Sequence, residues 1–223
     1  MITAVIFDLN GTVLSDEDEY GLAFKRVLTR LGAKVDSDYP HTAGIGVEEN
    51  WPPLLKKYNI KTQKTSLKLA RETQEEYIKQ IPGVDLRDGF ESFVSKLRDD
   101  KIFTALATSN NWSVVNILFQ KLDLEKYFDV VTTREEVLFS KPDPETFLKT
   151  AQKLQVEPEE CVVFEDSTAG IFAAKSAGMK TVGVARDESY AKMLKDADLV
   201  IYNYNDVSLD CLLYTSPSPR DRS

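Results

Sequence analysis

The chain has 223 residues, of which 42% are apolar, so it is long enough to bury a sizeable core. Its 36 acidic residues against 28 Lys and Arg give a net charge of −8, which argues against a nucleic-acid backbone or an anionic membrane as the main partner. We find no signal-peptide pattern and no apolar run of about 18 residues, and two widely separated cysteines favour a reducing cytoplasm.

The N-terminal segment predicts a strand that ends at a carboxylate. Residues 3–7 form a short apolar run, and Asp8 follows it directly. Gly11 allows the chain to turn sharply after this strand, and Thr12 can hold the turn by hydrogen bonds. Asn10 stands where a second carboxylate would form a nucleophile and acid/base pair with Asp8, which an amide cannot do.

Residues 15–85 are expected to form an all-α cap domain. Helical patterns at 17–31 and 65–80 flank a Gly- and Pro-rich loop at 41–55. About seventy mostly helical residues are too many for a single connection between two strands. We therefore interpret them as an insertion, with a hinge on each side.

Several cap residues have two readings. His41, the only histidine, is expected to be a surface polar residue, with a catalytic base donated by the cap as the alternative. Trp51 is expected in the cap core rather than as a platform for substrate. The charged stretch at 68–79 is expected to be a solvated helix face.

Strand and helix patterns alternate beyond the cap. Apolar runs predict strands at 102–107, 128–132, 161–165, 180–184 and 198–201, with helices near 88–100, 111–124, 144–154 and 168–177. These strands lack apolar/polar alternation, as do strands that are covered on both faces. The pattern predicts an α/β fold in which a doubly wound parallel, Rossmann-like sheet core (1–14 and 86–210) carries the inserted all-α cap (15–85).

The last segment differs from the rest. Residues 211–223, CLLYTSPSPRDRS, have no periodicity and resemble one reading frame of a transposon-type sequencing-library adapter. We interpret them as a non-native tail, with a disordered tail or an expression scar as the alternative. No function is assigned after Asp210.

Polar side chains gather where the predicted strands end. Ligands bind outside the carboxyl ends of the strands in open parallel sheets. The residues delivered there are Asp8, Thr108, Ser109, Asn110, Lys141, Glu165 and Asp166. Carboxylates can bind Mg²⁺ through hard oxygen atoms, while Thr108, the backbone N–H groups after it and Lys141 can hold a phosphoryl group.

Four short motifs in this order resemble those of the haloacid dehalogenase superfamily. They are Asp8-x-Asn10-Gly11-Thr12, Thr108, Lys141 and Glu165-Asp166. The strings SKPDPETF (140–147) and VVFEDSTAGIFAAKSAGM (162–179) resemble its phosphatase and β-phosphoglucomutase branch. The resemblance covers the predicted core and matches the cap only coarsely.

This resemblance implies roles for the residues that match the motifs. Asp8 would be the nucleophile, forming an aspartyl-phosphate, and a Mg²⁺ ligand. Thr108 and Lys141 would bind the phosphoryl group, with Ser109 and Asn110 beside them. Asp166, with Glu165 as a third ligand or a supporting partner, would complete the metal site, and residue 10 would bind the metal through its backbone carbonyl.

Asn10 departs from the family pattern, and this puts the proton-transfer steps in doubt. Expulsion of an alkoxide and activation of water both benefit from a carboxyl group at this position. Phosphonatases and dehalogenases also carry other residues here. A phosphonatase would need a cap lysine, for which Lys56 and Lys57 are formal candidates, and a dehalogenase would have little use for the Mg²⁺ set. A mutase is disfavoured because mutases carry a basic residue in the cap loop to bind a second phosphate, whereas this loop has Glu48 and Glu49. In addition, Gly21 lies near the position where mutases carry a histidine.

We therefore expect a Mg²⁺-dependent phosphohydrolase of a small phosphorylated metabolite, for example of the phosphoglycolate phosphatase type, slowed by Asn10. The alternative is a catalytically impaired phosphate- or metabolite-binding protein with the same fold. Neither a nucleic acid nor a membrane is expected as a partner, and the sequence predicts no oligomeric state.

Overall fold

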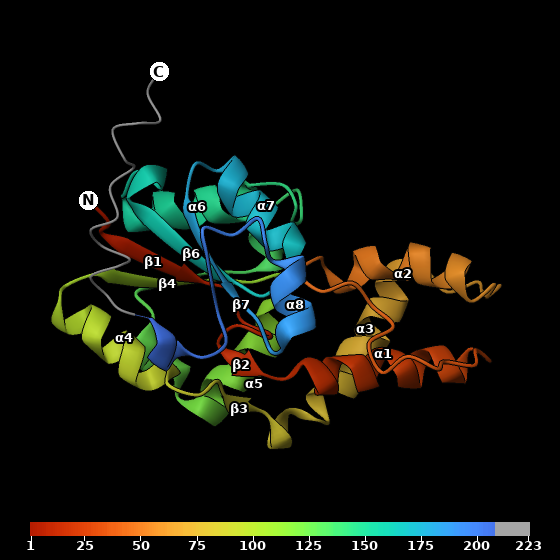
Figure 1. Ribbon diagram of the computed structural model, residues 1–223. Helices are drawn as coiled ribbons and strands as arrows, with labels where there is room; N and C mark the ends of the chain where they lie inside the picture. The colour runs from red at the N-terminus through yellow and green to blue at the C-terminus, as the bar shows by residue number, and fades with distance from the viewer. Residues whose placement is uncertain (208–223) are drawn as a thin grey trace.

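The computed structural model of the protein describes residues 1–207, and the predicted tail at 211–223 lies outside the described residues (Figure 1). Six strands form one parallel sheet in the order β5-β4-β1-β6-β7-β8. They are β1 (Ala4–Phe7), β4 (Phe103–Ala107), β5 (Val130–Thr132), β6 (Cys161–Glu165), β7 (Lys180–Val184) and β8 (Leu199–Ile201). The strand order reverses at β1, so a crevice opens at the carboxyl ends of β1 and its two neighbours.

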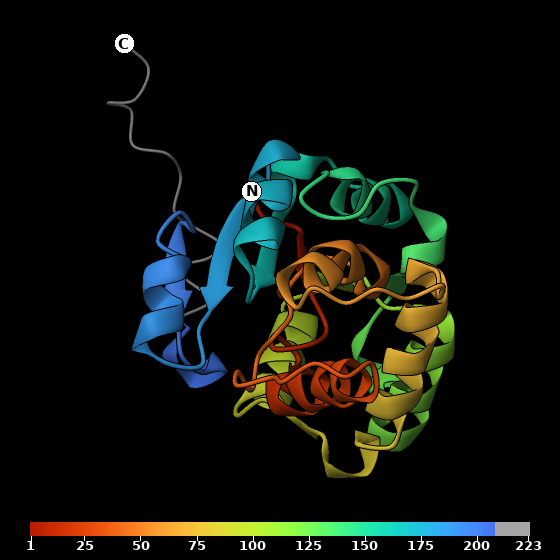
Figure 2. The ribbon, with the colours of Figure 1, turned by 90° about the vertical axis from the view of Figure 1, so that its right-hand side faces the viewer.

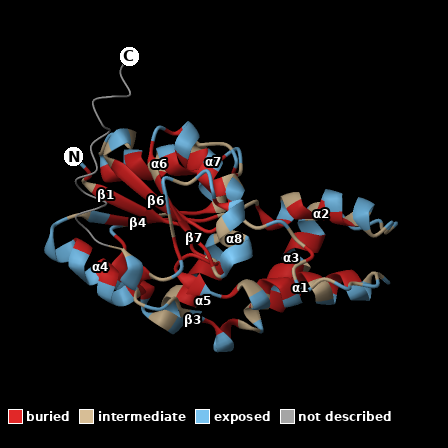
Figure 3. Cartoon of the chain, in the orientation of Figure 1, coloured by how far each residue is buried: buried red, intermediate tan, exposed pale blue. Residues whose placement is uncertain are grey.

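Helices cover both faces of this sheet (Figure 1). They are α4 (Phe90–Asp99), α5 (Trp112–Leu122), α6 (Glu145–Leu154), α7 (Thr168–Ser176) and α8 (Glu188–Met193). Ala4 and Ile6 of β1 share a core with α6 and α7, whereas Val5 and Phe7 share a core with α4 and α5. All four side chains are fully buried, as Figure 3 shows for the central strands. The strands lack alternation because both faces are covered, and the predicted α/β fold class is confirmed.

Three helices form a separate layer beyond the carboxyl ends of the strands (Figure 2). They are α1 (Glu17–Arg30), α2 (Val47–Lys57) and α3 (Ser66–Ile78). The chain enters this layer through β2 (Leu14–Ser15) and leaves it through β3 (Asp85–Leu86), and these two strands pair antiparallel. The division into core and cap at these residues remains our proposal. Within residues 1–207, no helix is long and apolar enough to cross a bilayer.

The predicted loop at 41–55 is wrong in its second half, because α2 begins at Val47. Pro52 and Pro53 stand inside this helix, where each removes one backbone donor. Trp51 and Leu54 are nevertheless buried, and the ring of Trp51 lies 5.8 Å from that of Phe24 in α1. Tertiary packing therefore outweighs the low helix propensity of proline, and Trp51 lies in the cap core as expected.

The expectation for 68–79 is also wrong for the inner face of α3. Leu69 and Tyr77 are fully buried, and the Glu76 carboxylate is largely buried. Its Oε1 lies 2.7 Å from Arg30 Nη1 and 2.7 Å from Lys79 Nζ. These ion pairs lower the pKa of Glu76 to about 2, so the carboxylate stays charged while it anchors α3 to α1.

Candidate active site

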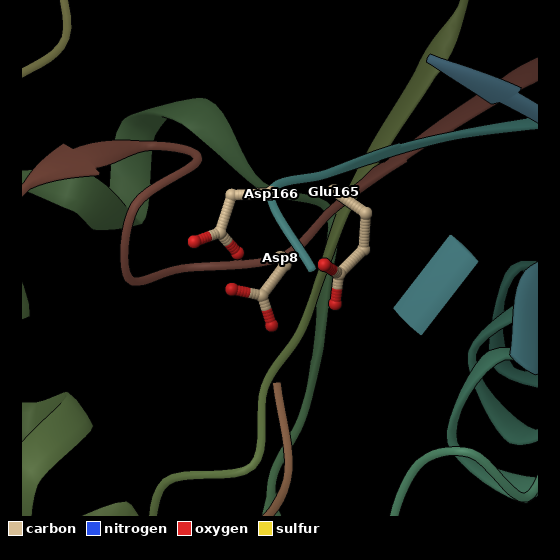
Figure 4. Close-up of side chains that lie close together, drawn as sticks. All are labelled: Asp8, Glu165 and Asp166. Carbon is tan, nitrogen blue, oxygen red and sulfur yellow. The ribbon is translucent and has the colours of Figure 1, made fainter. Parts of the chain in front are cut away.

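Asp8 stands at the carboxyl end of β1, beside the end of β6 (Figure 4). Its backbone N–H donates to Phe164 O at 2.9 Å, which extends the pairing of β1 with β6 by one residue. Gly11 then turns the chain with a φ of +70°, and a Cβ atom there would lie 2.2 Å from Asp166 Oδ2. Only glycine allows the turn to pass this close to the second carboxylate.

Three buried carboxylates converge at this point (Figure 4). Asp8, Glu165 and Asp166 each place an oxygen within 4.8 Å of the others. Burial raises the pKa of Asp8 to about 7 although Lys141 opposes this, and burial together with Glu165 raises the pKa of Asp166 well above its usual range. Lys141 brings one positive charge to three carboxyl groups, so when all three are ionised the cluster carries an excess of negative charge. Hard oxygen atoms in this number fit a divalent cation such as Mg²⁺.

Lys141 reaches the cluster from the segment after β5. Its buried Nζ lies 2.5 Å from Asp8 Oδ1 and 2.7 Å from Glu165 Oε1. Burial disfavours the charged amine, but the two carboxylates outweigh it and raise the pKa of Lys141. Glu165 Oε2 accepts from Ser167 N at 2.7 Å and from Ser167 Oγ at 2.8 Å. Both oxygens of Glu165 therefore have protein partners.

The segment after β4 lines a cavity next to Asp8 and Asp166. Thr108 donates its backbone N–H to Thr132 O at 3.0 Å, and its Oγ1 accepts from Asn110 N at 3.1 Å. Ser109 Oγ donates to Gly44 O of the cap at 3.2 Å. Asp8, Asp166 and the three residues after β4 thus line one cavity. Lys141 and Glu165 are not among its lining residues, but Lys141 contacts both Asp8 and Glu165.

The side chain of Asn10 is held by three neighbours. Its amide donates to Asp16 and to Tyr77 OH, the latter at 3.1 Å, and its oxygen accepts from Asn110 Nδ2. Asp16 also accepts from Gly11 N at 3.0 Å and from Tyr77 OH at 2.5 Å. Burial raises the pKa of Asp16 to about 6 although these hydrogen bonds oppose it. Both polar atoms of Asn10 are therefore engaged with protein groups.

Asp16, Tyr20 and Tyr77 were not predicted as site residues. Tyr20 OH donates to Asn110 Oδ1, and its ring stacks on Tyr77 with centroids 3.9 Å apart. In the sequence, Asp16 belongs to the acidic run SDEDEY, which is typical of a solvated surface. The useful signal is the spacing of four between Asp16 and Tyr20, which places two polar side chains on one helix face.

The cap supplies the outer wall of a cavity of about 100 Å³. His41 lines this wall, and its ring stacks on Phe24 with centroids 4.7 Å apart and planes 10° apart. His41 is half-buried, so the expectation of a surface residue holds only in part: one face of its ring packs on the apolar side of α1. Its Nδ1 atom is buried without a hydrogen-bond partner, and burial lowers the pKa of the imidazole to about 4. The ring is therefore neutral near pH 7.

Three other cap residues singled out in the sequence lie outside the cavity lining. Lys56 and Lys57 are exposed at the end of α2 and do not line it. Glu49 Oε1 accepts from Arg134 Nη2 at 2.9 Å and from Ser140 Oγ at 2.6 Å, so it joins the cap to the core beside the site.

Comparison with known proteins gives concordant matches. The family model for "Haloacid dehalogenase-like hydrolase" matches residues 5–184. A phosphorylated carbohydrates phosphatase from Thermotoga maritima is 36% identical over 88% of this chain and 92% of its own length. A fructose-1-phosphate phosphatase from Escherichia coli is 32% identical over 81% of this chain and 95% of its own length. A crystal structure of β-phosphoglucomutase from Clostridium difficile is 28% identical, with a TM-score of 0.84 over 95% of this chain and 96% of its own.

Proposed function

Since the chain belongs to the haloacid dehalogenase-like hydrolase family, we propose that it is a Mg²⁺-dependent phosphohydrolase of small phosphorylated carbohydrates and related phosphomonoesters. The observation that carries this proposal is the convergence of Asp8, Lys141 and Asp166 at the carboxyl end of the sheet. Relatives named as carbohydrate phosphatases support the substrate class.

In our proposal, Asp8, Asp166 and the backbone carbonyl of Asn10 hold the metal. When bound, Mg²⁺ would neutralise phosphate oxygens and the surplus of buried carboxylates. Glu165 is assigned a supporting role, because its two oxygens already hold Lys141 and Ser167. It keeps the lysine directed at Asp8 while the phosphoryl group is transferred.

The proposed chemistry begins at a carboxylate oxygen of Asp8. This oxygen attacks phosphorus, the bond from phosphorus to the ester oxygen breaks, and an aspartyl-phosphate and an alkoxide result. Lys141 and Thr108 bind the phosphoryl oxygens as charge develops on them. The alkoxide takes a proton from solvent water and leaves as the alcohol. A second water molecule then attacks phosphorus, the bond from phosphorus to the Asp8 oxygen breaks, and phosphate leaves while the proton of the attacking water goes to solvent.

Asn10 affects the two steps that need a proton carrier. Its amide can donate a hydrogen bond, but it cannot protonate the alkoxide or accept a proton from the attacking water. A leaving group that is already a weak base does not need the first proton. We therefore expect aryl and acyl phosphates to react faster than alkyl phosphates.

The experiment is a phosphate-release panel with and without Mg²⁺. Acetyl phosphate and p-nitrophenyl phosphate should be hydrolysed only with Mg²⁺, and glycerol 1-phosphate should react more slowly. The Asp8→Asn variant is the matched control, since it removes the nucleophilic charge with little change in volume. A folded protein that releases no phosphate from any ester contradicts the proposal.

A second candidate is a phosphoryl-binding protein that stalls after the first transfer. The full engagement of Asn10 by Asp16, Tyr77 and Asn110 favours it, because no free group at position 10 is left to activate water. Intact-mass spectrometry after acetyl phosphate separates the two. A lasting phosphoryl adduct supports the stalled protein, and rapid phosphate release excludes it.

A mutase finds less support at this site. A Cβ atom on Gly21 would lie 2.3 Å from Asp38 O, so the buried face of α1 does not accept a histidine there. The cap segment in which a mutase would need a basic residue for a second phosphate has Glu48 and Glu49 instead, and Glu49 pairs with Arg134 of the core.

A further inference from the structure

We infer that Arg87 is a positioning residue for the metal site, because together with Asp16 it fixes the turn at Gly11 from which the carbonyl group of Asn10 projects. This inference rests on the proposed function, in which that carbonyl binds Mg²⁺. It gives a role to a side chain outside the four motifs, and it joins the metal site to the first turn of the cap helix α1.

The peptide group between Asn10 and Gly11 has a fixed direction. Its N–H donates to Asp16 Oδ1 at 3.0 Å, and the peptide bond is trans. The C=O of Asn10 belongs to the same planar group, so it points the opposite way. No hydrogen bond to this oxygen is formed within residues 1–207, so it keeps its capacity to bind a cation.

Arg87 holds the other side of Gly11. Its Nε donates to Gly11 O at 2.6 Å, and its backbone N–H donates to Val13 O at 2.9 Å. Arg87 directly follows β3, the strand through which the chain leaves the cap layer. Glycine has the widest conformational range of any residue. Asp16 and Arg87 therefore restrain both peptide groups at the point where the backbone is otherwise most free to rotate.

The same guanidinium links this turn to the cap. Its Nη2 lies 2.5 Å from Oε1 of Glu17, in the first turn of α1. The side chains of Arg87 and Glu17 are only 9% and 17% exposed, so solvent ions screen this pair little. Asp16 is the residue directly before Glu17 and precedes α1 as its N-cap. The start of α1 therefore contacts Gly11 on both sides, once directly and once through Arg87.

Charge and position predict opposite effects when Arg87 is replaced. Glu17 lines the cavity together with Asp8 and Asp166. Without the arginine, Glu17 has no counterion, and the surroundings of the metal site become more negative, which by charge alone strengthens cation binding. Loss of the restraint on Gly11 weakens it, because groups that orient metal ligands typically contribute about 10- to 100-fold to metal affinity. The direction of the change therefore separates the two effects.

The test is a Mn²⁺ titration followed by electron paramagnetic resonance, without any phosphate ester. Mn²⁺ prefers the same carboxylate and carbonyl oxygen ligands as Mg²⁺. We expect the dissociation constant to rise about tenfold in Arg87→Met, with the fold checked by circular dichroism. An unchanged or lower dissociation constant overturns the inference. An unaltered protein that binds no Mn²⁺ overturns both the inference and the proposed function.

A second variant keeps the charge. Arg87→Lys retains the cation near Glu17 but loses the planar fork that contacts Gly11 O and Glu17 at once. We expect weaker Mn²⁺ binding here too, by a smaller factor than in Arg87→Met. This variant decides the inference if Arg87→Met does not fold, and an unchanged affinity then overturns it.

Arg134→Met is the matched control. Arg134 also contacts one main-chain oxygen, Val137 O at 3.0 Å, and one cap carboxylate, Glu49 Oε1 at 2.9 Å. Its loss should lower stability without changing Mn²⁺ affinity. An equal loss of affinity in Arg134→Met shows a general effect of loosening the cap and overturns the inference.

Turnover separates this inference from the proposed function. If acetyl phosphate is hydrolysed, the Mg²⁺ concentration that gives the half-maximal rate should rise about tenfold in Arg87→Met, with kcat at saturating Mg²⁺ largely retained. Hydrolysis with an unshifted Mg²⁺ dependence overturns the inference and leaves the proposed function intact. If no ester is hydrolysed, the proposed function fails, and the Mn²⁺ titration still decides the inference.

Discussion

Asn10 lies against the cavity but gives both of its polar atoms to protein neighbours, Asp16, Tyr77 and Asn110. The uncharged amide thus links the buried carboxylate of Asp16 to Tyr77 and Asn110 by hydrogen bonds. Because the metal contact in our proposal uses the backbone carbonyl, replacing the carboxyl group by an amide leaves metal binding in place. What the amide removes is proton transfer to the alkoxide and from the attacking water.

Replacing Asn10 by Asp should therefore change rate in a leaving-group-dependent way. We expect Asn10→Asp to raise kcat for glycerol 1-phosphate about 100-fold, since a carboxyl group can protonate the alkoxide. The gain for acetyl phosphate should be much smaller. Steady-state kinetics with both esters measures this, and an equal gain for both, or none, contradicts the assignment.

The same substitution should weaken the fold. Asn10→Asp places a second carboxylate against buried Asp16, and we expect the free energy of unfolding to fall by about 1–3 kcal/mol at pH 7. Adding Asp16→Asn should recover most of this loss, because an amide again faces a carboxylate. Urea denaturation of the four members of the double-mutant cycle in EDTA measures the coupling. Additive effects would show that the two side chains do not interact.

His41 makes stability depend on pH. Its pKa is about 4 in the folded protein, against an ordinary value of 6.5. A pKa lowered by folding means that the unfolded chain binds the proton more tightly, so the contribution is complete above pH 6.5 and is lost as the pH falls toward 4. Up to about 3 kcal/mol is expected from this residue. Denaturation at pH 7.5 and 4.5 should show a smaller drop for His41→Phe than for the unaltered protein, and equal drops would contradict it.

At the scale of elements, the cap loop before α2 closes the site by backbone contact. Gly44 has a φ of +80°, and a Cβ atom there would lie 1.9 Å from Ser167 Oγ. Gly44 O also accepts from Ser109 Oγ. The loop therefore contacts the residues after β4 and β6, and its position depends on the absence of a side chain.

Gly44→Ala should push this loop away from the core. We expect kcat/KM for glycerol 1-phosphate to fall about 10- to 100-fold, because the cap would no longer position the leaving group. Gly32→Ala is the matched control: its φ is +89°, but a Cβ atom there meets nothing within 4 Å. It should cost about 1 kcal/mol of stability with unchanged kcat/KM. Similar kinetics for both variants would argue against a role for loop closure.

At the scale of the whole molecule, much of the core could be predicted from sequence because both faces of its strands are buried. Continuous apolar runs marked the six strands of the sheet, and the four motifs indicated the family, which the family model and relatives confirm. Rules for parallel sheets then place polar residues at strand ends that meet in one crevice. Asp8, Thr108, Lys141 and Asp166 were predicted in this way, and their roles stay a prediction.

The cap was less predictable because its structure depends on contacts between distant segments. Two prolines made the sequence of α2 resemble a loop, because its helical form depends on burial of Trp51 and Leu54. Asp16 looked like one of several surface acids until Tyr77, sixty-one residues away in sequence, was placed on it. Such pairings leave no local pattern in a single sequence.

If Asp8 carries the phosphoryl group during turnover, the intermediate can be trapped chemically. The protein is treated with acetyl phosphate and Mg²⁺, quenched with borohydride, digested and analysed by mass spectrometry. Borohydride reduces an aspartyl-phosphate to homoserine, so we expect homoserine at position 8, and none in a sample without Mg²⁺. Phosphate release without any reduced residue at position 8 would contradict it.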